Sequence, residues 1–251
     1  MGKETEQKQE IVNQGVHTYS QEEAYVWPEE PVLREQLEWF QDQKLALMVH
    51  WGVYNQLGMV ASWALSDEDA EWSRKTVDWT DDGEVFKRQY RALNRAFDPV
   101  AFQPEEWAKM AKECGFRYLI LTTKHHDGFC LWDTAYTEYK TTAEDCPFHT
   151  HKYADIVCAM FDAFRKEKLG IGVYYSKADW HCPDYWEKEK VFTGKTTRNP
   201  TYDPKENPEA WERFRAFTRD QILELGKQYG RLDILWFDAG WVAATNGQDI
   251  R

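Results

Sequence analysis

The sequence predicts an α/β protein of the (β/α) barrel class, and three observations favour that fold. Apolar strand signals alternate with amphipathic helix signals, the pattern of parallel strands joined by helical crossovers. Polar residues gather where the strands end, and barrel enzymes build their active sites at the C-terminal ends of strands. No glycine-rich phosphate-binding loop follows any strand, which disfavours a doubly wound nucleotide-binding sheet. The expected fold is therefore a (β/α)8 TIM-like barrel.

The number of strands limits how much of that barrel the chain can form. The pattern contains four strands of this type, whereas a closed barrel needs eight and typically about 250 residues without a long arm or long loops. We expect the chain to supply only about the first half of the barrel. A half barrel leaves two sheet edges and much apolar surface uncovered, so the isolated chain is expected to be poorly stable and nearly inactive.

Composition divides the chain into two regions. Residues 1–25 are polar, rich in Gln and Glu and without periodicity, so they are expected to form an N-terminal arm. Residues 26–251 carry the strand and helix signals and are expected to form the N-terminal portion of the barrel. No internal repeat or low-complexity segment divides this second region further.

The first unit of the pattern is a strand followed by a long insertion. The apolar run 45–49 is typical of a buried parallel strand, and His50 stands at its end. From 62 to 97 the chain is rich in Trp and charge with weak periodicity. This segment is expected to be a long loop with short helices that helps to shape a site.

The second unit begins with a helix. Pro and two acidic residues follow Gln103, and both features favour a helix start. Trp107, Met110, Ala111 and Cys114 fall on one face of this helix, which is expected to be buried. The next strand is predicted over 118–122.

Two further units complete the pattern. A helix over 154–168 has apolar residues at helical spacing, and the strand 171–175 follows it. Asn207 is the expected N-cap of the last helix, because Pro and Glu come directly after it. The run 232–238 is the fourth strand and ends at Asp238.

Composition excludes several classes of function. The formal net charge is -12 and the sequence pI about 5.1, so a nucleic acid backbone would be repelled and is not an expected partner. The five Cys form no C-x-x-C pair and are expected to be free thiols. No apolar run has the roughly 18 to 20 residues that a membrane span needs, and the polar start has no signal-peptide core. The chain as given is expected to be soluble.

Two aspartates flank the fourth strand. Asp238 stands at the C-terminal end of this strand, close in sequence to Trp236 and Trp241. This position makes it the candidate nucleophile. The alternative is a capping Asp at a strand-to-loop turn, since Asp is common there. Asp233, at the start of the same strand, is better explained as such a cap.

Histidines follow the first two strands. His125 and His126 could orient hydroxyl groups of a ligand, bind a metal or bond to neighbouring loops. No H-E-x-x-H motif or clustered Cys/His spacing supports a metal, so we expect neither a metal nor a cofactor. His50 alone is more often a satisfied buried histidine, although its place at the strand end favours a role. No motif indicates a Ser or Cys nucleophile.

Three segments resemble the signatures of glycoside hydrolase family 29, the α-L-fucosidases, in order and position. They are 48–52 (MVHWG), 122–129 (TTKHHDGF) and 235–238 (LWFD). The resemblance runs from about Trp39 to the end of the chain. A fourth segment, 176–183 (SKADWHCP), is similar to a variant of Bacteroides-type members.

The resemblance implies a retaining exo-α-L-fucosidase that hydrolyses terminal α-L-fucosyl linkages of a fucosylated oligosaccharide or glycoconjugate. Asp238 would attack the anomeric carbon, and water would release fucose from the glycosyl-enzyme with retained configuration. No cofactor is implied. The implied substrate-binding residues are His50, His125, His126, Tyr174 and Trp236.

The family also has a Glu and a Trp from the loop after the first strand in its pocket. In this chain they map either to Glu71 and Trp72 or to the region around Trp63. The second alignment leaves Ala61 where relatives carry Glu, so a pocket carboxylate would be missing. Activity or specificity would then differ from that of the relatives.

The resemblance places the general acid/base Glu of the family beyond residue 251. A catalytically silent fucose-binding relative is therefore the alternative function, and a metal-dependent hydrolase that uses His125 and His126 is the third. The expected location is periplasmic or secreted, although no signal peptide is present in the chain as given.

Overall fold

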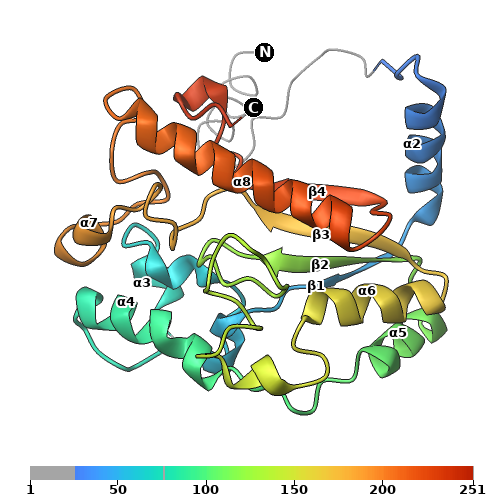
Figure 1. Ribbon diagram of the computed structural model, residues 1–251, viewed down its shortest axis with the longest axis horizontal. Coiled ribbons are helices and arrows are strands. Elements are labelled where there is room, and N and C mark those ends of the chain that lie inside the picture. The colour runs from blue at the N-terminus through green and yellow to red at the C-terminus, as the bar shows by residue number, and fades with distance from the viewer. Residues whose placement is uncertain (1–25, 76, 251) are drawn as a thin grey trace, which may run out of the picture.

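Four parallel strands form one sheet in chain order, with helices between them (Figure 1). The computed structural model describes residues 26–75 and 77–250. The predicted N-terminal arm, 1–25, therefore lies outside the described residues. Parallel strands in sequential order with helical connections are the repeating unit of a (β/α)8 barrel. The predicted fold class is confirmed, and the described chain contributes four strands of such a barrel.

The register of the sheet brings equivalent residues of all four strands into rows. Val49 pairs with Leu121, Leu121 with Val173, and Val173 with Leu235. Because side chains alternate between the two faces of a strand, every row presents its side chains to one face. The strands are β1 (Ala46–Val49), β2 (Tyr118–Lys124), β3 (Gly170–Ser176) and β4 (Ile234–Asp238).

Helices cover one face of the sheet and its N-terminal edge. The helices between the strands pack on one face, where they bury most of the core. A helix before β1 stands beyond the N-terminal ends of the strands (Figure 1), and its Trp39 ring lies 6.2 Å from the ring of Tyr118. These helices are α5 (Pro104–Glu113), α6 (Ile156–Lys166), α8 (Pro208–Gln228) and, before β1, α2 (Pro31–Gln43).

Short helices interrupt the loops beyond the C-terminal ends of the strands. The predicted insertion after the first strand is confirmed, because several one- or two-turn elements lie between β1 and α5. The elements before α5 are η1 (Val53–Leu57), η2 (Ser62–Leu65), α3 (Ala70–Ser73), α4 (Gly83–Arg91) and η3 (Ala92–Ala96). The later ones are η4 (Pro147–Thr150), α7 (Lys188–Thr193) and η5 (Ala244–Asn246).

The predicted cap of α8 is confirmed, but the predicted face of α5 is partly wrong. The Asn207 side chain accepts a hydrogen bond from the backbone N–H of Ala210, as an N-cap does. On α5, Ala108 and Ala111 are fully buried, whereas Met110 is 51% exposed. Cys114 is exposed as well, whereas Trp107 packs partly buried against the core. The buried stripe therefore follows Trp107 and the alanines, which let the helix pack closely.

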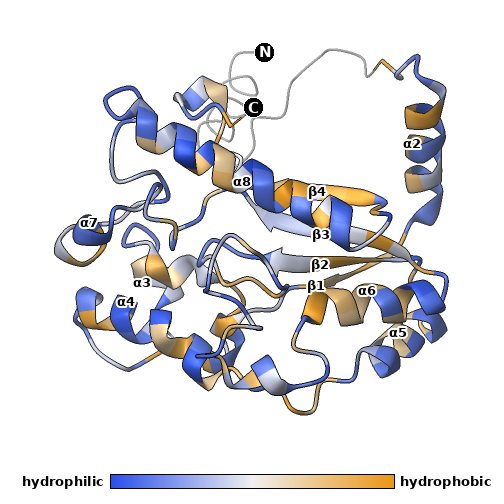
Figure 2. Cartoon of the chain, viewed as in Figure 1, coloured by the Kyte–Doolittle hydropathy of each residue, from blue (hydrophilic) through white to orange (hydrophobic). Residues whose placement is uncertain are grey.

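The two inner strands are buried and the two outer strands are not. Every residue of β2 is buried, and so is every residue of β3 except Gly170. No residue of β1 or β4 is classed as buried, although β4 is strongly hydrophobic (Figure 2). The face opposite the helices carries only a small cluster of Tyr118, Ile120 and Tyr174.

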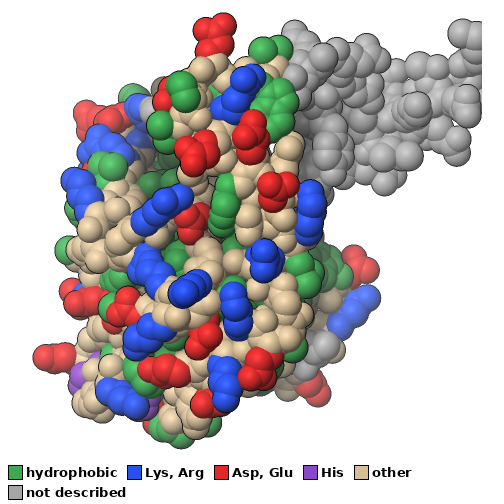
Figure 3. Space-filling model, turned by 90° about the vertical axis from the view of Figure 1, so that its right-hand side faces the viewer, with side chains coloured by type: hydrophobic (Ala, Val, Ile, Leu, Met, Phe, Trp, Pro, Cys, Tyr) green, Lys and Arg blue, Asp and Glu red, His purple; other side chains and the backbone are tan. Residues whose placement is uncertain are grey.

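The surface near α2 carries both signs of charge. Lys and Arg side chains alternate with Asp and Glu on this side of the molecule, and no patch of one sign dominates it (Figure 3). In the described part of the chain, no helix is both long and apolar enough to cross a membrane. All five Cys are free, as predicted.

Candidate active site

Strand geometry brings the predicted residues to one end of the sheet. Tyr174 pairs with Trp236 and Ser176 with Asp238, so these four side chains share the face opposite the helices. His50 follows β1, and its ring lies 5.2 Å from that of Tyr174 at nearly a right angle. The C-terminal ends of neighbouring parallel strands thus supply the site, as expected for a barrel.

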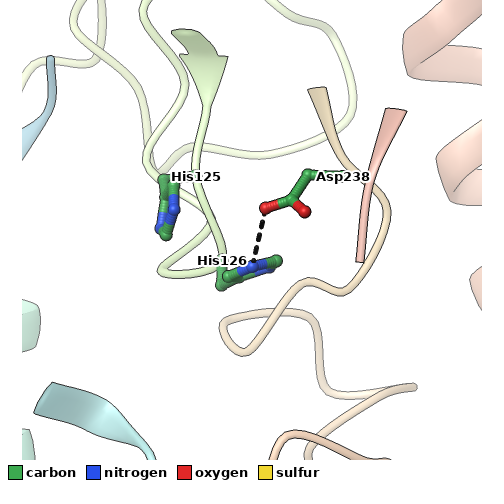
Figure 4. A group of neighbouring side chains, drawn as sticks. All are labelled: His125, His126 and Asp238. Carbon is green, nitrogen blue, oxygen red and sulfur yellow. Dashed lines mark ion pairs between the residues drawn. The ribbon is translucent and has the colours of Figure 1, made fainter. Parts of the chain in front are cut away.

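Asp238 is held by two side chains from the inner strands and their loops. The hydroxyl of Tyr174 donates a hydrogen bond to Asp238 Oδ2. His126 Nε2 faces the same oxygen (Figure 4), at 3.3 Å. Burial alone would raise the pKa of the Asp238 carboxyl. The contacts with His126, Tyr174 and the backbone of Ala239 outweigh it and hold the pKa well below its usual range. The carboxylate is therefore ionised and fixed in place.

His126 has an oxygen atom beside each ring nitrogen. Its Nδ1 lies 3.2 Å from the carbonyl oxygen of Ala178, and its Nε2 faces Asp238. The side chain is completely buried. His126 is thus held between the loop after β3 and the C-terminal end of β4.

The other two histidines are anchored by hydroxyl groups. Ser62 Oγ lies 2.5 Å from His125 Nδ1, and Thr122 Oγ1 lies 2.7 Å from His50 Nδ1. Burial lowers the pKa of both imidazoles, and the nearby His126 lowers it further. The proximity of Asp238 opposes this shift without reversing it. Both rings are therefore neutral near pH 7, with one nitrogen left for a ligand.

A buried ion pair lies under the loop that carries these histidines. Lys124 Nζ lies 2.7 Å from Asp179 Oδ2, and both side chains are almost fully buried. The other oxygen of Asp179 accepts hydrogen bonds from the backbone N–H groups of His181 and Cys182. A Cβ on Gly128, where φ is +79°, would lie 2.5 Å from that oxygen. The loop after β2 is thus packed tightly against the loop after β3.

Three tryptophan rings surround His126, and together we call them the aromatic wall. The ring centres of Trp63, Trp180 and Trp241 lie 5.0, 4.9 and 5.1 Å from that of His126. Trp63 also contacts His125 at 6.0 Å. Such rings suit the apolar face of a sugar.

The two alternatives for the pocket tryptophan differ in their positions. Trp63 belongs to the aromatic wall, whereas Glu71 and Trp72 lie on α3 and are exposed. The indole N–H of Trp72 donates to Asp69 and not to a histidine of the site. Trp236 points to the face of the site but is 49% exposed.

Several residues of the site carried little signal in the sequence. Ser62 and Thr122 anchor histidines, yet isolated hydroxyl residues occur throughout the chain. Trp180 lies after β3 in the segment 176–183, whose resemblance to Bacteroides-type members implied no role for this Trp. Only proximity in the fold identifies these residues.

The geometry allows two kinds of chemistry. A fixed carboxylate beside neutral histidines and aromatic rings can bind a polyhydroxy ligand and attack an electrophilic carbon. Within the described residues, His125, His126 and Asp238 also form a group whose potential ligand atoms lie within 4.8 Å of one another, so they could hold a metal ion.

Known proteins resemble the chain in sequence and in structure. A profile of the family described as Alpha-L-fucosidase matches residues 12–251. The tissue α-L-fucosidase of Rattus norvegicus is 27% identical over 203 residues, which are 81% of this chain and 39% of the relative. The chain thus spans about two fifths of the length of that relative.

Solved structures of α-L-fucosidases are also similar to the chain. The α-L-fucosidase isoenzyme 1 from Paenibacillus thiaminolyticus is 33% identical with a TM-score of 0.60, covering 81% of this chain and 42% of that one. A family 29 α-L-fucosidase from Bacteroides thetaiotaomicron, trapped as a covalent intermediate with 2-fluoro-fucosyl fluoride, is 29% identical with a TM-score of 0.59. The match covers 87% of this chain and 44% of that one. With nearly its whole length matched by the family profile, the chain belongs to the α-L-fucosidase family.

Proposed function

We propose that the protein is a retaining exo-α-L-fucosidase in which Asp238 is the nucleophile. The observation that carries the proposal is the ionised Asp238 carboxylate at the C-terminal end of β4, fixed by Tyr174 and His126. The trapped covalent intermediate of the similar Bacteroides thetaiotaomicron enzyme supports a double-displacement reaction.

The contacts of Asp238 indicate which of its oxygens reacts. Both Tyr174 and His126 contact Oδ2, so Oδ1 is the oxygen we assign to the attack. It forms a bond to the anomeric carbon while the bond to the leaving oxygen breaks. Water then attacks the same carbon while the bond to Asp238 Oδ1 breaks, and the two inversions give retention.

The histidines would bind the hydroxyl groups of fucose. His50 and His125 are neutral and anchored at Nδ1, so each presents its second nitrogen as a hydrogen-bond partner. Trp63 would contact an apolar face of the fucose ring, and Trp236 would line one side of the pocket. We assign the pocket tryptophan to Trp63, because it touches the histidines and Trp72 is exposed.

Other features of the proposal come from the resemblance alone. The general acid/base Glu is assigned to no described residue. The substrate is a terminal α-L-fucosyl group of an oligosaccharide or glycoconjugate, in a Bacteroides-type enzyme that is periplasmic or secreted. No metal is needed for the chemistry.

The test is hydrolysis of an aryl α-L-fucoside by the full-length protein. An activated aryl leaving group needs little acid assistance, so the rate reports mainly on the nucleophile. We expect Asp238→Gly to lose activity by orders of magnitude, and azide to restore it with an inverted glycosyl azide as product. Asp233→Gly is the control, because it removes a carboxyl from the start of the same strand.

Other outcomes would decide against the proposal. Full activity in Asp238→Gly would remove the nucleophile assignment. A wild type that binds L-fucose in calorimetry without turnover would favour the silent fucose-binding relative. Loss of activity in EDTA, restored by a divalent ion, would favour a metal-dependent hydrolase that uses His125 and His126.

A further inference from the structure

One arginine contacts every ring of the aromatic wall. The guanidinium carbon of Arg198 lies 4.8 Å from the ring centre of Trp63 and 5.9 Å from that of Trp241. Its backbone carbonyl accepts hydrogen bonds from the indole N–H groups of Trp180 at 3.3 Å and Trp241 at 3.0 Å. The side chain and backbone of one residue thus hold all three rings.

Acidic side chains fix the plane of the Arg198 guanidinium. Its Nε donates to Asp69 Oδ2 at 2.9 Å, and its Nη2 donates to Asp69 Oδ1 at 2.5 Å. Glu68 Oε1 lies 3.2 Å from Nε. A planar fork bonded to both oxygens of a carboxylate has a defined orientation, which leaves its face for an aromatic ring. Lysine could not supply this geometry.

The same contacts join two loops that are far apart in sequence. Asp69 and Trp63 belong to the insertion after β1, whereas Arg198 lies after α7. A second link runs beside the first, because Asp67 accepts a hydrogen bond from the backbone N–H of Thr196 at 2.8 Å. The position of Trp63 relative to His126 therefore depends on how these loops are joined.

We infer that Arg198 is a positioning residue that holds Trp63 and Trp241 against His126. It does not contact the reacting carboxylate in the described structure and acts through the rings. An effect of Arg198 on the kinetics rests on the proposed function, since it requires the aromatic wall to bind the fucosyl substrate. Its effect on the positions of the tryptophan rings does not depend on that function.

The first test compares the kinetics of Arg198→Lys and Arg198→Ala with the wild type. Because a displaced binding wall misplaces the substrate, we expect kcat/KM to fall roughly ten- to a hundredfold, with most of the change in KM. Arg198→Lys keeps the charge but not the planar fork and should recover little. Arg213→Ala is the matched control, because Arg213 pairs with Asp184 on the surface and contacts no ring of the wall.

The second test needs no activity. In protein labelled with 5-fluorotryptophan, the fluorine signals of Trp63 and Trp241 are assigned with Trp63→Phe and Trp241→Phe. Both signals should shift or broaden in Arg198→Ala and Arg198→Lys and stay unchanged in Arg213→Ala. Circular dichroism checks that each variant is folded.

The two tests separate the inference from the proposed function. Unchanged fluorine signals in a folded Arg198→Ala variant would overturn the positioning role. So would a fall in kcat/KM that Arg213→Ala reproduces. If the wild type cleaves no fucoside but the signals still shift, the proposed function fails and Arg198 keeps its structural assignment.

Discussion

The inner and outer strands of the sheet differ in burial, and the site is divided between them. His125 and His126 follow β2, which is buried throughout, and Tyr174 lies on the similarly buried β3. Asp238 ends β4, where no residue is classed as buried. The inner strands therefore supply the histidines and the tyrosine, and they hold the outer carboxylate through Tyr174 and His126. The inner groups are fixed by packing together with hydrogen bonds such as that between Ser62 and His125, whereas the partly exposed Asp238 depends on the contacts of its carboxylate.

The largest loss of stability is expected when the buried positive charge of Lys124 is removed from the inner region. Lys124→Met leaves the carboxylate of Asp179 buried without its partner, and such a loss costs about 3 to 5 kcal/mol. We expect the free energy of unfolding in urea to fall by that amount. The loop with His125 and His126 should also lose order, because the Asp179 carboxylate packs against Gly128 in that loop.

Lys140→Met is the matched control for this prediction. Lys140 pairs with Asp133, whose side chain is 61% exposed, so the pair is worth at most about 1 kcal/mol. Similar losses in both variants would mean that the buried pair is not what stabilises the inner region.

A second prediction measures the difference between the strands with one kind of substitution. Leu121 on β2 is fully buried, and Leu235 on β4, in the same row of the sheet, is 49% exposed. Leu121→Ala should cost about 2 to 5 kcal/mol, from lost burial and the cavity left behind. Leu235→Ala should cost less than about half of that, because much of its surface already meets water.

Thermal unfolding of both variants in the full-length protein gives the measurement. Equal costs would mean that further chain or a partner covers the outer face of β4 in solution. The difference in burial between the inner and outer strands would then be absent from the protein in solution.

The parts that could be predicted from the sequence are those that periodic patterns determine. The apolar runs of the strands place their C-terminal ends, and thereby Asp238, His125 and Tyr174, at one edge of the sheet. The helix with five apolar residues at helical spacing was predicted correctly, and all five are fully buried. They are Ile156, Val157, Met160, Phe161 and Phe164.

The loops could not be predicted in the same way, because their positions depend on contacts between distant segments. Trp63 and Trp72 both follow β1 in a region of weak periodicity, and only the fold separates them. Arg198 contacts Asp69 across 129 positions of the sequence. No local pattern encodes such a pair, so the aromatic wall had to be read from the structure.

The smallest expected effect concerns the link between the two regions. Tyr174→Phe removes the hydrogen bond that the Tyr174 hydroxyl, on β3, donates to the Asp238 carboxylate, on β4. A hydrogen bond to a charged group contributes about 1.5 to 3 kcal/mol. Since the Asp238 side chain is 31% exposed, we expect the low end of that range. Urea unfolding at pH 6 should detect this loss.

The same substitution should change how stability depends on pH. The pKa of Asp238 is lower in the folded protein than its unfolded value of about 3.9, so its ionised form contributes stability that is present above that pH. This contribution is lost as the pH falls below about 4 towards the folded pKa. The difference between wild type and Tyr174→Phe should therefore be largest at pH 6 and shrink below pH 4. In the control Tyr153→Phe, the lost hydroxyl also lowers the pKa of a carboxyl, that of Glu105, but this carboxyl is exposed to solvent, so a much smaller difference is expected. A difference that stays constant down to pH 3 would mean that Tyr174 stabilises the sheet by packing and does not hold the ionised carboxylate.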